Sequence, residues 1–190
     1  MNLTDQQWEL FDFVKQQHQE QFRKYTGEPY FVHILRVVEI LSPYSQVDME
    51  LETGLCHDLL ERTSCSKLLL VNKFKELKYD LYSRSKIAKG VYDLTNVYNE
   101  QKYPRYTRAE RKQLEAERLI DIEPFSQTVK YAELIDNIPS ISKFDPDFAW
   151  TYLDEIASYI GDLNEGNMDL YQECCKILHS SINSLKMPLD

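Results

Sequence analysis

The sequence predicts an all-α protein, an irregular helical bundle in a single domain that spans residues 1–190. Only five residues are glycine, which leaves little material for the tight turns of β architectures. Apolar residues recur at helical spacing between residues that typically cap helices. The sequence shows no convincing alternation of apolar and polar residues of the kind that indicates a strand. Because 43% of the residues are apolar and 12% aromatic, intrinsic disorder is excluded as the main state.

Five helices are expected in the first half of the chain. Thr4 and Gln7 form a capping box, in which each side chain bonds the backbone amide of the other, so the first helix begins there. Asp48 can cap the third helix, where leucines recur every four residues. The expected helices cover residues 5–24, 30–41, the segment from Asp48 with Leu51, Leu55 and Leu59, 66–78 and 82–97.

Further helices are expected in the second half, which gives eight or nine in all. Thr107 and Glu110 form another capping box, which opens a highly charged helix. Pro139 is expected to end or kink the following helix, because proline lacks the amide donor and crowds the preceding turn. The expected helices run from about Thr107 to residue 121, from Pro124 to Pro139, from Asp145 to residue 162, and from residue 167 to 185.

Charge and cysteine content restrict the partners and the location. The 22 basic and 31 acidic residues give a net charge of −9, which repels nucleic-acid backbones and anionic membranes, so we expect neither as a partner. The four cysteines form no CxxC pair and are interpreted as reduced thiols. No leader and no run of about 18 apolar residues is present, so a cytoplasmic location is expected. The oligomeric state stays open.

Polar residues interrupt three apolar helices. His33 lies in YFVHILRVV, the pair His57 and Asp58 lies in GLCHDLLE, and Glu133 lies in KYAELIDN. Taken singly, each could be satisfied by the backbone, but a buried carboxylate needs a partner. Together they could converge on one cation as a mixed nitrogen and oxygen set, which suits Mn²⁺, Fe²⁺, Co²⁺ or Zn²⁺ better than Mg²⁺ or Ca²⁺.

The strings RKYTGEPYFVH, LCHDLLERT and VKYAELIDN resemble those of the HD-superfamily metal-dependent phosphohydrolases. The resemblance is closest to the hydrolase domain of the Rel/Spo alarmone enzymes and their small free-standing relatives, and it covers about residues 5–160. It implies that His33, His57, Asp58 and Glu133 bind Mn²⁺, with Fe²⁺, Co²⁺ or Zn²⁺ as alternatives. It also implies removal of the 3′-pyrophosphate from guanosine tetra- or pentaphosphate, with the ion activating a water and neutralising phosphate charge.

Two positions depart from the pattern of this family. Glu133 stands where the family usually has aspartate, but it offers the same ligand atoms. Arg62 stands where the family usually has a second carboxylate after Glu61, and it brings a fixed cation that could bind a phosphate. The substrate therefore need not be the usual alarmone.

The resemblance also implies roles for two residues near the expected metal. Glu61, one turn after His57, is similar to the general acid/base or water-orienting carboxylate of the family, and Asn137 could fix water or substrate by its amide. The alternatives are an exposed helix carboxylate for Glu61 and a C-terminal helix cap for Asn137.

A polyphosphate substrate also requires cations. Residues 102–112 contain five basic residues against the single acid Glu110, within an acidic protein. They could present a phosphate-binding edge beside a helix N-terminus, or form a solvated charged helix. The residues predicted to bind substrate are Arg23, Lys24, Arg62, Arg105, Arg108, Arg111, Lys112 and Lys130.

Three hypotheses follow from the sequence. The leading one is a Mn²⁺-dependent nucleotide phosphohydrolase, most specifically a small alarmone hydrolase that cleaves the 3′-pyrophosphate of guanosine tetraphosphate. A second keeps the metal chemistry but acts on another nucleotide or phosphate ester. A third is a non-catalytic module that binds a nucleotide without hydrolysing it.

Overall fold

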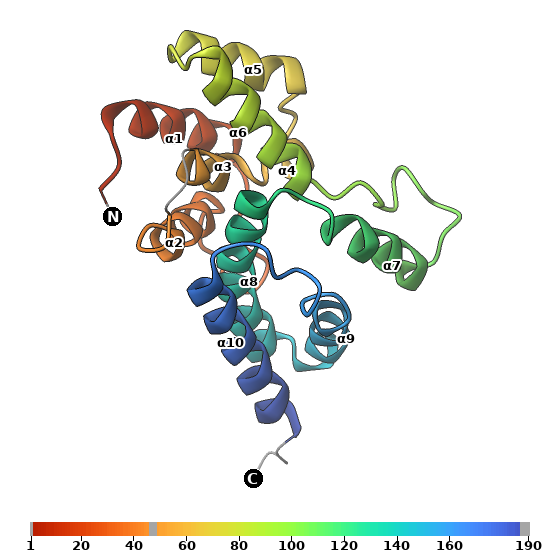
Figure 1. The fold of residues 1–190 in the computed structure, drawn as a ribbon. Coiled ribbons are helices and arrows are strands. Elements are labelled where there is room, and N and C mark those ends of the chain that lie inside the picture. The colour runs from red at the N-terminus through yellow and green to blue at the C-terminus, as the bar shows by residue number, and fades with distance from the viewer. Residues whose placement is uncertain (1, 46–48, 187–190) are drawn as a thin grey trace.

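The computed structural model describes residues 2–45 and 49–186, which contain ten helices and one isolated β-bridge between Phe22 and Pro29 (Figure 1). The helices are α1 (Asp5–Gln17), α2 (Phe31–Leu41), α3 (Glu50–Cys56), α4 (Leu59–Arg62), α5 (Lys67–Glu76), α6 (Leu81–Leu94), α7 (Arg108–Leu119), α8 (Pro124–Phe144), α9 (Pro146–Ala157) and α10 (Met168–Lys186). The all-α prediction is confirmed. Within these residues, none of the helices combines the length and apolar character that crossing a membrane requires.

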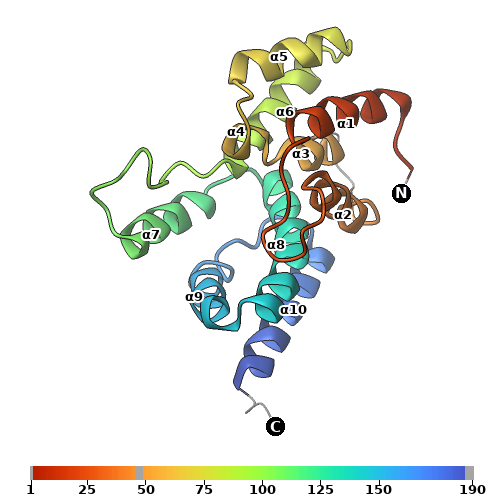
Figure 2. The same ribbon diagram turned by 180° about the vertical axis from the view of Figure 1, so that it is seen from behind.

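Helix α8 lies at the centre of the bundle. It packs against α2, α3, α6, α9 and α10, while α7 stands to one side at the end of a long connection (Figures 1 and 2). Two apolar clusters meet along this arrangement. One joins α1 to α6 around residues such as Leu10 and Ile34, and the other joins α8, α9 and α10 around Val129 and Leu170. The buried faces of α2, α3 and α8 therefore fix the relative positions of the polar residues they carry.

Two helix boundaries near the N-terminus differ from the prediction. Helix α1 begins with the expected Thr4 capping box but ends at Gln17 instead of continuing to residue 24. Beyond it, the side chain of Gln21 bonds His18 and the backbone of Arg62, and this holds residues 18–30 in a strap across the bundle. The predicted cap Asp48 lies outside the described residues.

The expected third helix is interrupted at its polar pair. α3 ends at Cys56 and α4 begins at Leu59, so His57 and Asp58 form the short connection between the two helices. By contrast, α8 does not end at Pro139 but continues to Phe144. Burial of the neighbouring Ile138 against the second apolar cluster offsets the hydrogen bond that proline cannot donate.

Gly90 sets the distance between α6 and its neighbours. A Cβ atom at this position would lie 2.6 Å from Thr53 Cγ2 and 2.8 Å from Phe125 Cε2. We expect Gly90→Val to lower the free energy of unfolding by about 1–3 kcal/mol through overpacking, as measured by urea denaturation. Gly161→Val is the matched control, because nothing lies within 4 Å of a Cβ there. Equal losses in the two variants would contradict the close packing of α6 on α3.

Candidate active site

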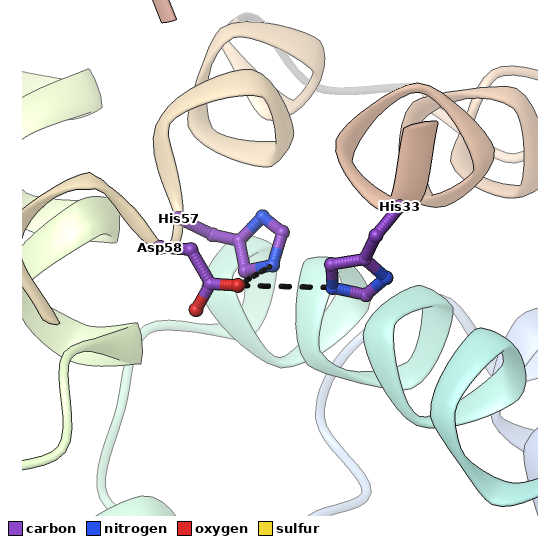
Figure 3. A group of neighbouring side chains, drawn as sticks. All are labelled: His33, His57 and Asp58. Carbon is purple, nitrogen blue, oxygen red and sulfur yellow. Dashed lines mark ion pairs between the residues drawn. The ribbon is translucent and has the colours of Figure 1, made fainter. Parts of the chain in front are cut away.

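Three of the four predicted metal ligands converge between α2, α3 and α4 (Figure 3). One ligand atom from each of His33, His57 and Asp58 lies within 4.8 Å of the others, and all three residues are buried. Asp58 Oδ2 lies 3.7 Å from His33 Nε2 and 3.4 Å from His57 Nε2. The carboxylate therefore faces the same nitrogen of both imidazoles. These three residues are called the His/Asp cluster below.

The imidazole of His57 has the orientation that a metal ligand requires. Its Nδ1 donates to the carbonyl oxygen of Gly54 at 2.8 Å, and this orients the ring so that Nε2 faces Asp58 Oδ2. Among the described residues, the buried Nε2 has no hydrogen-bond partner. Metal-bound histidines characteristically donate their other nitrogen to a carbonyl or carboxylate, so the cluster fits a divalent ion.

The charges in the cluster also suit a cation. Burial alone would raise the pKa of Asp58, but His57 and Arg62 hold it well below its ordinary value. Burial would lower the pKa of His57, but the Asp58 carboxylate outweighs this effect and raises it to about 9. Burial lowers the pKa of His33, so this ring is neutral. A divalent ion would replace the proton that His57 otherwise carries.

Glu133, the fourth predicted ligand, lies outside the His/Asp cluster. Its Oε2 accepts a hydrogen bond from Lys130 Nζ at 2.9 Å, and its Oε1 accepts one from Asn137 Nδ2 at 3.3 Å. Burial would raise the pKa of Glu133, but Lys130 and His57 lower it, so the carboxylate is charged. Glu133 is therefore held by Lys130 and Asn137 in this structure, and its role as a fourth ligand stays a prediction.

A cavity of about 400 Å³ is lined by Asp58 of the cluster and by Glu133. Six of the eight predicted substrate-binding residues line it: Arg23, Lys24, Arg62, Arg108, Lys112 and Lys130. Arg105 and Arg111 do not line it, so the cavity lends the prediction for these two no support. Helix α7 turns Arg108 and Lys112 toward the cavity, whereas the guanidinium of Arg111 bonds the backbone carbonyl of Tyr106.

Glu61 and Asn137, the two predicted catalytic residues, both line this cavity. Glu61 Oε2 accepts a hydrogen bond from the backbone amide of Asn96 at 2.9 Å. Asn137 Oδ1 accepts one from Arg23 Nη1 at 3.0 Å. Because α8 continues beyond it, Asn137 is no helix cap, and its amide is held at the cavity wall between Arg23 and Glu133.

Arg62 stands between the two carboxylates of the α4 segment. Its Nε lies 3.3 Å from Asp58 Oδ2, and its Nη2 lies 3.8 Å from Glu61 Oε1. The guanidinium carbon is 5.5 Å from the centroid of the Tyr30 ring. With half of its side chain exposed to the cavity mouth, Arg62 places a permanent positive charge beside the cluster.

Two residues at the site received no catalytic or metal-related role from the sequence. The Tyr30 hydroxyl donates to Asp58 Oδ2 at 2.5 Å, and Asp136 Oδ2 accepts from His33 Nδ1 at 2.6 Å. Tyr30 precedes His33 by three residues, and Asp136 follows Glu133 by three. Side chains at this spacing are neighbours on a helix, which is the signal that could have indicated both residues.

No family model matches the chain. Comparison with curated proteins finds relatives, and the match covers only part of the length of each relative. A protein of Mycoplasma genitalium named probable guanosine-3′,5′-bis(diphosphate) 3′-pyrophosphohydrolase is 28% identical over 137 residues, which cover 69% of this chain and 18% of that protein. A protein of Mycoplasma pneumoniae with the same name is 29% identical over 136 residues, or 68% and 17% of the two chains. The chain thus matches less than a fifth of these relatives.

A solved structure matches almost the whole chain. It is that of a metazoan ortholog of SpoT described as hydrolysing ppGpp, with a TM-score of 0.76 and 19% sequence identity. The match covers 95% of this chain and 97% of the other. The chain therefore shares the overall fold of that protein. The helical-bundle fold expected from the sequence is thereby confirmed.

Proposed function

We propose that this chain is a divalent-metal-dependent phosphohydrolase that removes the 3′-pyrophosphate group from guanosine tetraphosphate. The observation that carries the proposal is the His/Asp cluster at the wall of a cavity lined by six basic side chains. The names of the two curated relatives and the description of the SpoT ortholog support the same reaction.

In this proposal His33, His57 and Asp58 hold the ion, with Mn²⁺ preferred and Fe²⁺, Co²⁺ or Zn²⁺ as alternatives. Glu133, whose charged carboxylate lines the same cavity, is the fourth proposed ligand. When bound, the ion supplies a water of lowered pKa and neutralises charge on the scissile phosphate. The geometry of His57 supports this assignment, because the Gly54 carbonyl holds Nδ1 and the buried Nε2 faces the Asp58 carboxylate, as a shared ion would require.

The side chains of the cavity perform the remaining tasks. Arg62, beside the cluster, is proposed to bind the phosphate that leaves, while Arg108 and Lys112 bind the more distant phosphates. Glu61 accepts the proton of the attacking water or returns one to the leaving oxygen, and Asn137 orients water or substrate through its amide. Six basic and five acidic side chains line the cavity, so its local charge is far less negative than the net charge of −9, which would otherwise repel a polyphosphate.

The direct test is turnover by the purified protein. Incubation with Mn²⁺ and guanosine tetraphosphate should release pyrophosphate and guanosine diphosphate in equal amounts. The control is the double variant His57→Ala, Asp58→Ala, which lacks two residues of the cluster. Turnover of the wild-type protein no higher than that of this variant would reject the proposal.

A second candidate substrate class is favoured by Arg62. Its ion pair with Asp58 places a cation where a second carboxylate is usual in the family that the sequence resembles, so another nucleotide or phosphate ester could fit better. A panel of nucleotides assayed for phosphate and pyrophosphate release separates this candidate from the first. Tight nucleotide binding without release of either product would instead indicate a non-catalytic binding module.

Basic residues of segment 102–112 that line the cavity should affect substrate binding more than those that do not. Lys112 lines the cavity, and Arg105 does not. Because a charged hydrogen bond to phosphate contributes about 1.5–3 kcal/mol, we expect Lys112→Ala to raise KM at least about tenfold. Arg105→Ala should change it less than about twofold. Steady-state kinetics on both variants measure this, and similar KM values would show that the cavity is not the phosphate site.

A further inference from the structure

Asp136 connects three side chains from two other parts of the chain. Only 7% of its side chain is exposed on α8. Its Oδ2 accepts a hydrogen bond from His33 Nδ1 at 2.6 Å and lies 3.4 Å from Arg23 Nη2. Its Oδ1 accepts one from Arg36 Nε at 2.5 Å. One carboxylate thus contacts a member of the His/Asp cluster and a cation that lines the cavity.

The surroundings of Asp136 hold its carboxylate in place. Arg36 is itself held by Glu28, whose two carboxylate oxygens accept from Nη1 at 3.0 Å and from Nη2 at 2.5 Å. Arg36 therefore adds a contact on the side of Asp136 away from the cluster, while Arg23 and His33 contact the other oxygen.

We propose that Asp136 is a positioning residue that directs His33 Nε2 toward Asp58 and links this ligand to Arg23. A charged carboxylate can only accept hydrogen bonds, so it holds the proton of His33 on Nδ1 and leaves the lone pair on Nε2. The same oxygen lies beside Arg23, whose Nη1 donates to Asn137, so the cavity wall and the cluster share one anchor. Asp136 itself does not line the cavity.

This inference rests on the proposed metal site, and its test uses the metal alone. The affinity of the metal-free protein for Mn²⁺ can be measured by electron paramagnetic resonance of the free ion. Removing an outer hydrogen-bond partner of a metal-binding histidine typically weakens affinity about 10–100-fold. We expect a loss of this size in Asp136→Ala and a smaller loss in Asp136→Asn, whose amide oxygen can still accept from His33.

Arg36→Met is the matched control. It removes the contact to Oδ1 and leaves the contact of Oδ2 with His33 in place. We expect its Mn²⁺ affinity to stay within about threefold of the wild type, because the partner of the histidine is kept. Circular dichroism and thermal melting report whether each variant is folded. If Asp136→Ala does not fold, the Mn²⁺ affinities of Asp136→Asn and Arg36→Met are compared instead. The inference then requires a weaker affinity in Asp136→Asn than in Arg36→Met.

A second readout requires neither metal nor substrate. In nitrogen-15 spectra of the metal-free protein, His33 should be the Nδ1–H tautomer in the wild type and in Arg36→Met, and a mixture in Asp136→Ala. An unchanged tautomer together with unchanged Mn²⁺ affinity in folded Asp136→Ala would overturn the inference. Equal weakening in Asp136→Asn and Arg36→Met would also overturn it, by indicating a general structural role. A wild-type protein that binds no Mn²⁺ would instead refute the proposed metal site, while the tautomer still tests Asp136.

Discussion

Asp58→Ala is expected to reduce kcat/KM for guanosine tetraphosphate by at least about 1000-fold, which corresponds to about 4 kcal/mol of transition-state stabilisation. Asp58 supplies the only carboxylate of the His/Asp cluster, and both imidazoles face it. Its removal takes away an oxygen ligand and leaves His57 without the anion that balances a cation at this position. Steady-state kinetics in the presence of Mn²⁺ measure the loss.

The matched control for Asp58 is Asp12→Ala, which removes an exposed carboxylate from α1, away from the cavity. We expect this variant to retain wild-type activity. The Asp58 variant should keep its helical circular dichroism, because the apolar clusters that define the fold do not include this side chain. A folded Asp58→Ala protein with near-normal activity would place the chemistry elsewhere.

Glu61→Gln should produce the second-largest loss, about 100- to 10,000-fold in kcat, the range typical for removal of a general acid or base. The amide keeps an oxygen that can accept from the backbone amide of Asn96, so the local structure should survive. KM and Mn²⁺ affinity should change little, because Glu61 is assigned neither to phosphate nor to the ion. Rapid-mixing kinetics at saturating substrate and Mn²⁺ measure kcat.

Glu117→Gln is the control for this variant, because it changes an exposed glutamate of α7 that lies outside the main cavity. A Glu61→Gln protein with unchanged kcat would support the alternative that this residue is an ordinary exposed helix carboxylate. A change confined to KM would assign it to substrate binding instead.

The sequence predicts the His/Asp cluster for a physical reason. His33, His57 and Asp58 interrupt apolar helices, and buried polar groups require partners, so their convergence could be expected before the fold was known. The position of Glu133 could not. Lys130 precedes it by one helical turn, and an ion pair at this spacing competes with metal binding in a way that depends on the surrounding side chains.

The other differences also arise from tertiary structure. Charge alone predicts a basic surface over residues 102–112, but the rotation of α7 decides that Lys112 reaches the cavity and Arg111 does not. Pro139 disfavours a helix locally, yet the buried position of α8 maintains one. The strap over residues 18–30 is held by a hydrogen bond from Gln21 to the backbone of Arg62, 41 residues later, which local patterns cannot indicate.

The central claim is that His33, His57 and Asp58 hold one divalent ion. Crystals grown with Mn²⁺ and measured at the manganese absorption edge test it most directly. We predict a single strong anomalous peak bounded by His33 Nε2, His57 Nε2 and an Asp58 carboxylate oxygen. An anomalous peak bound only by other residues, or no peak here at saturating Mn²⁺, would contradict the account.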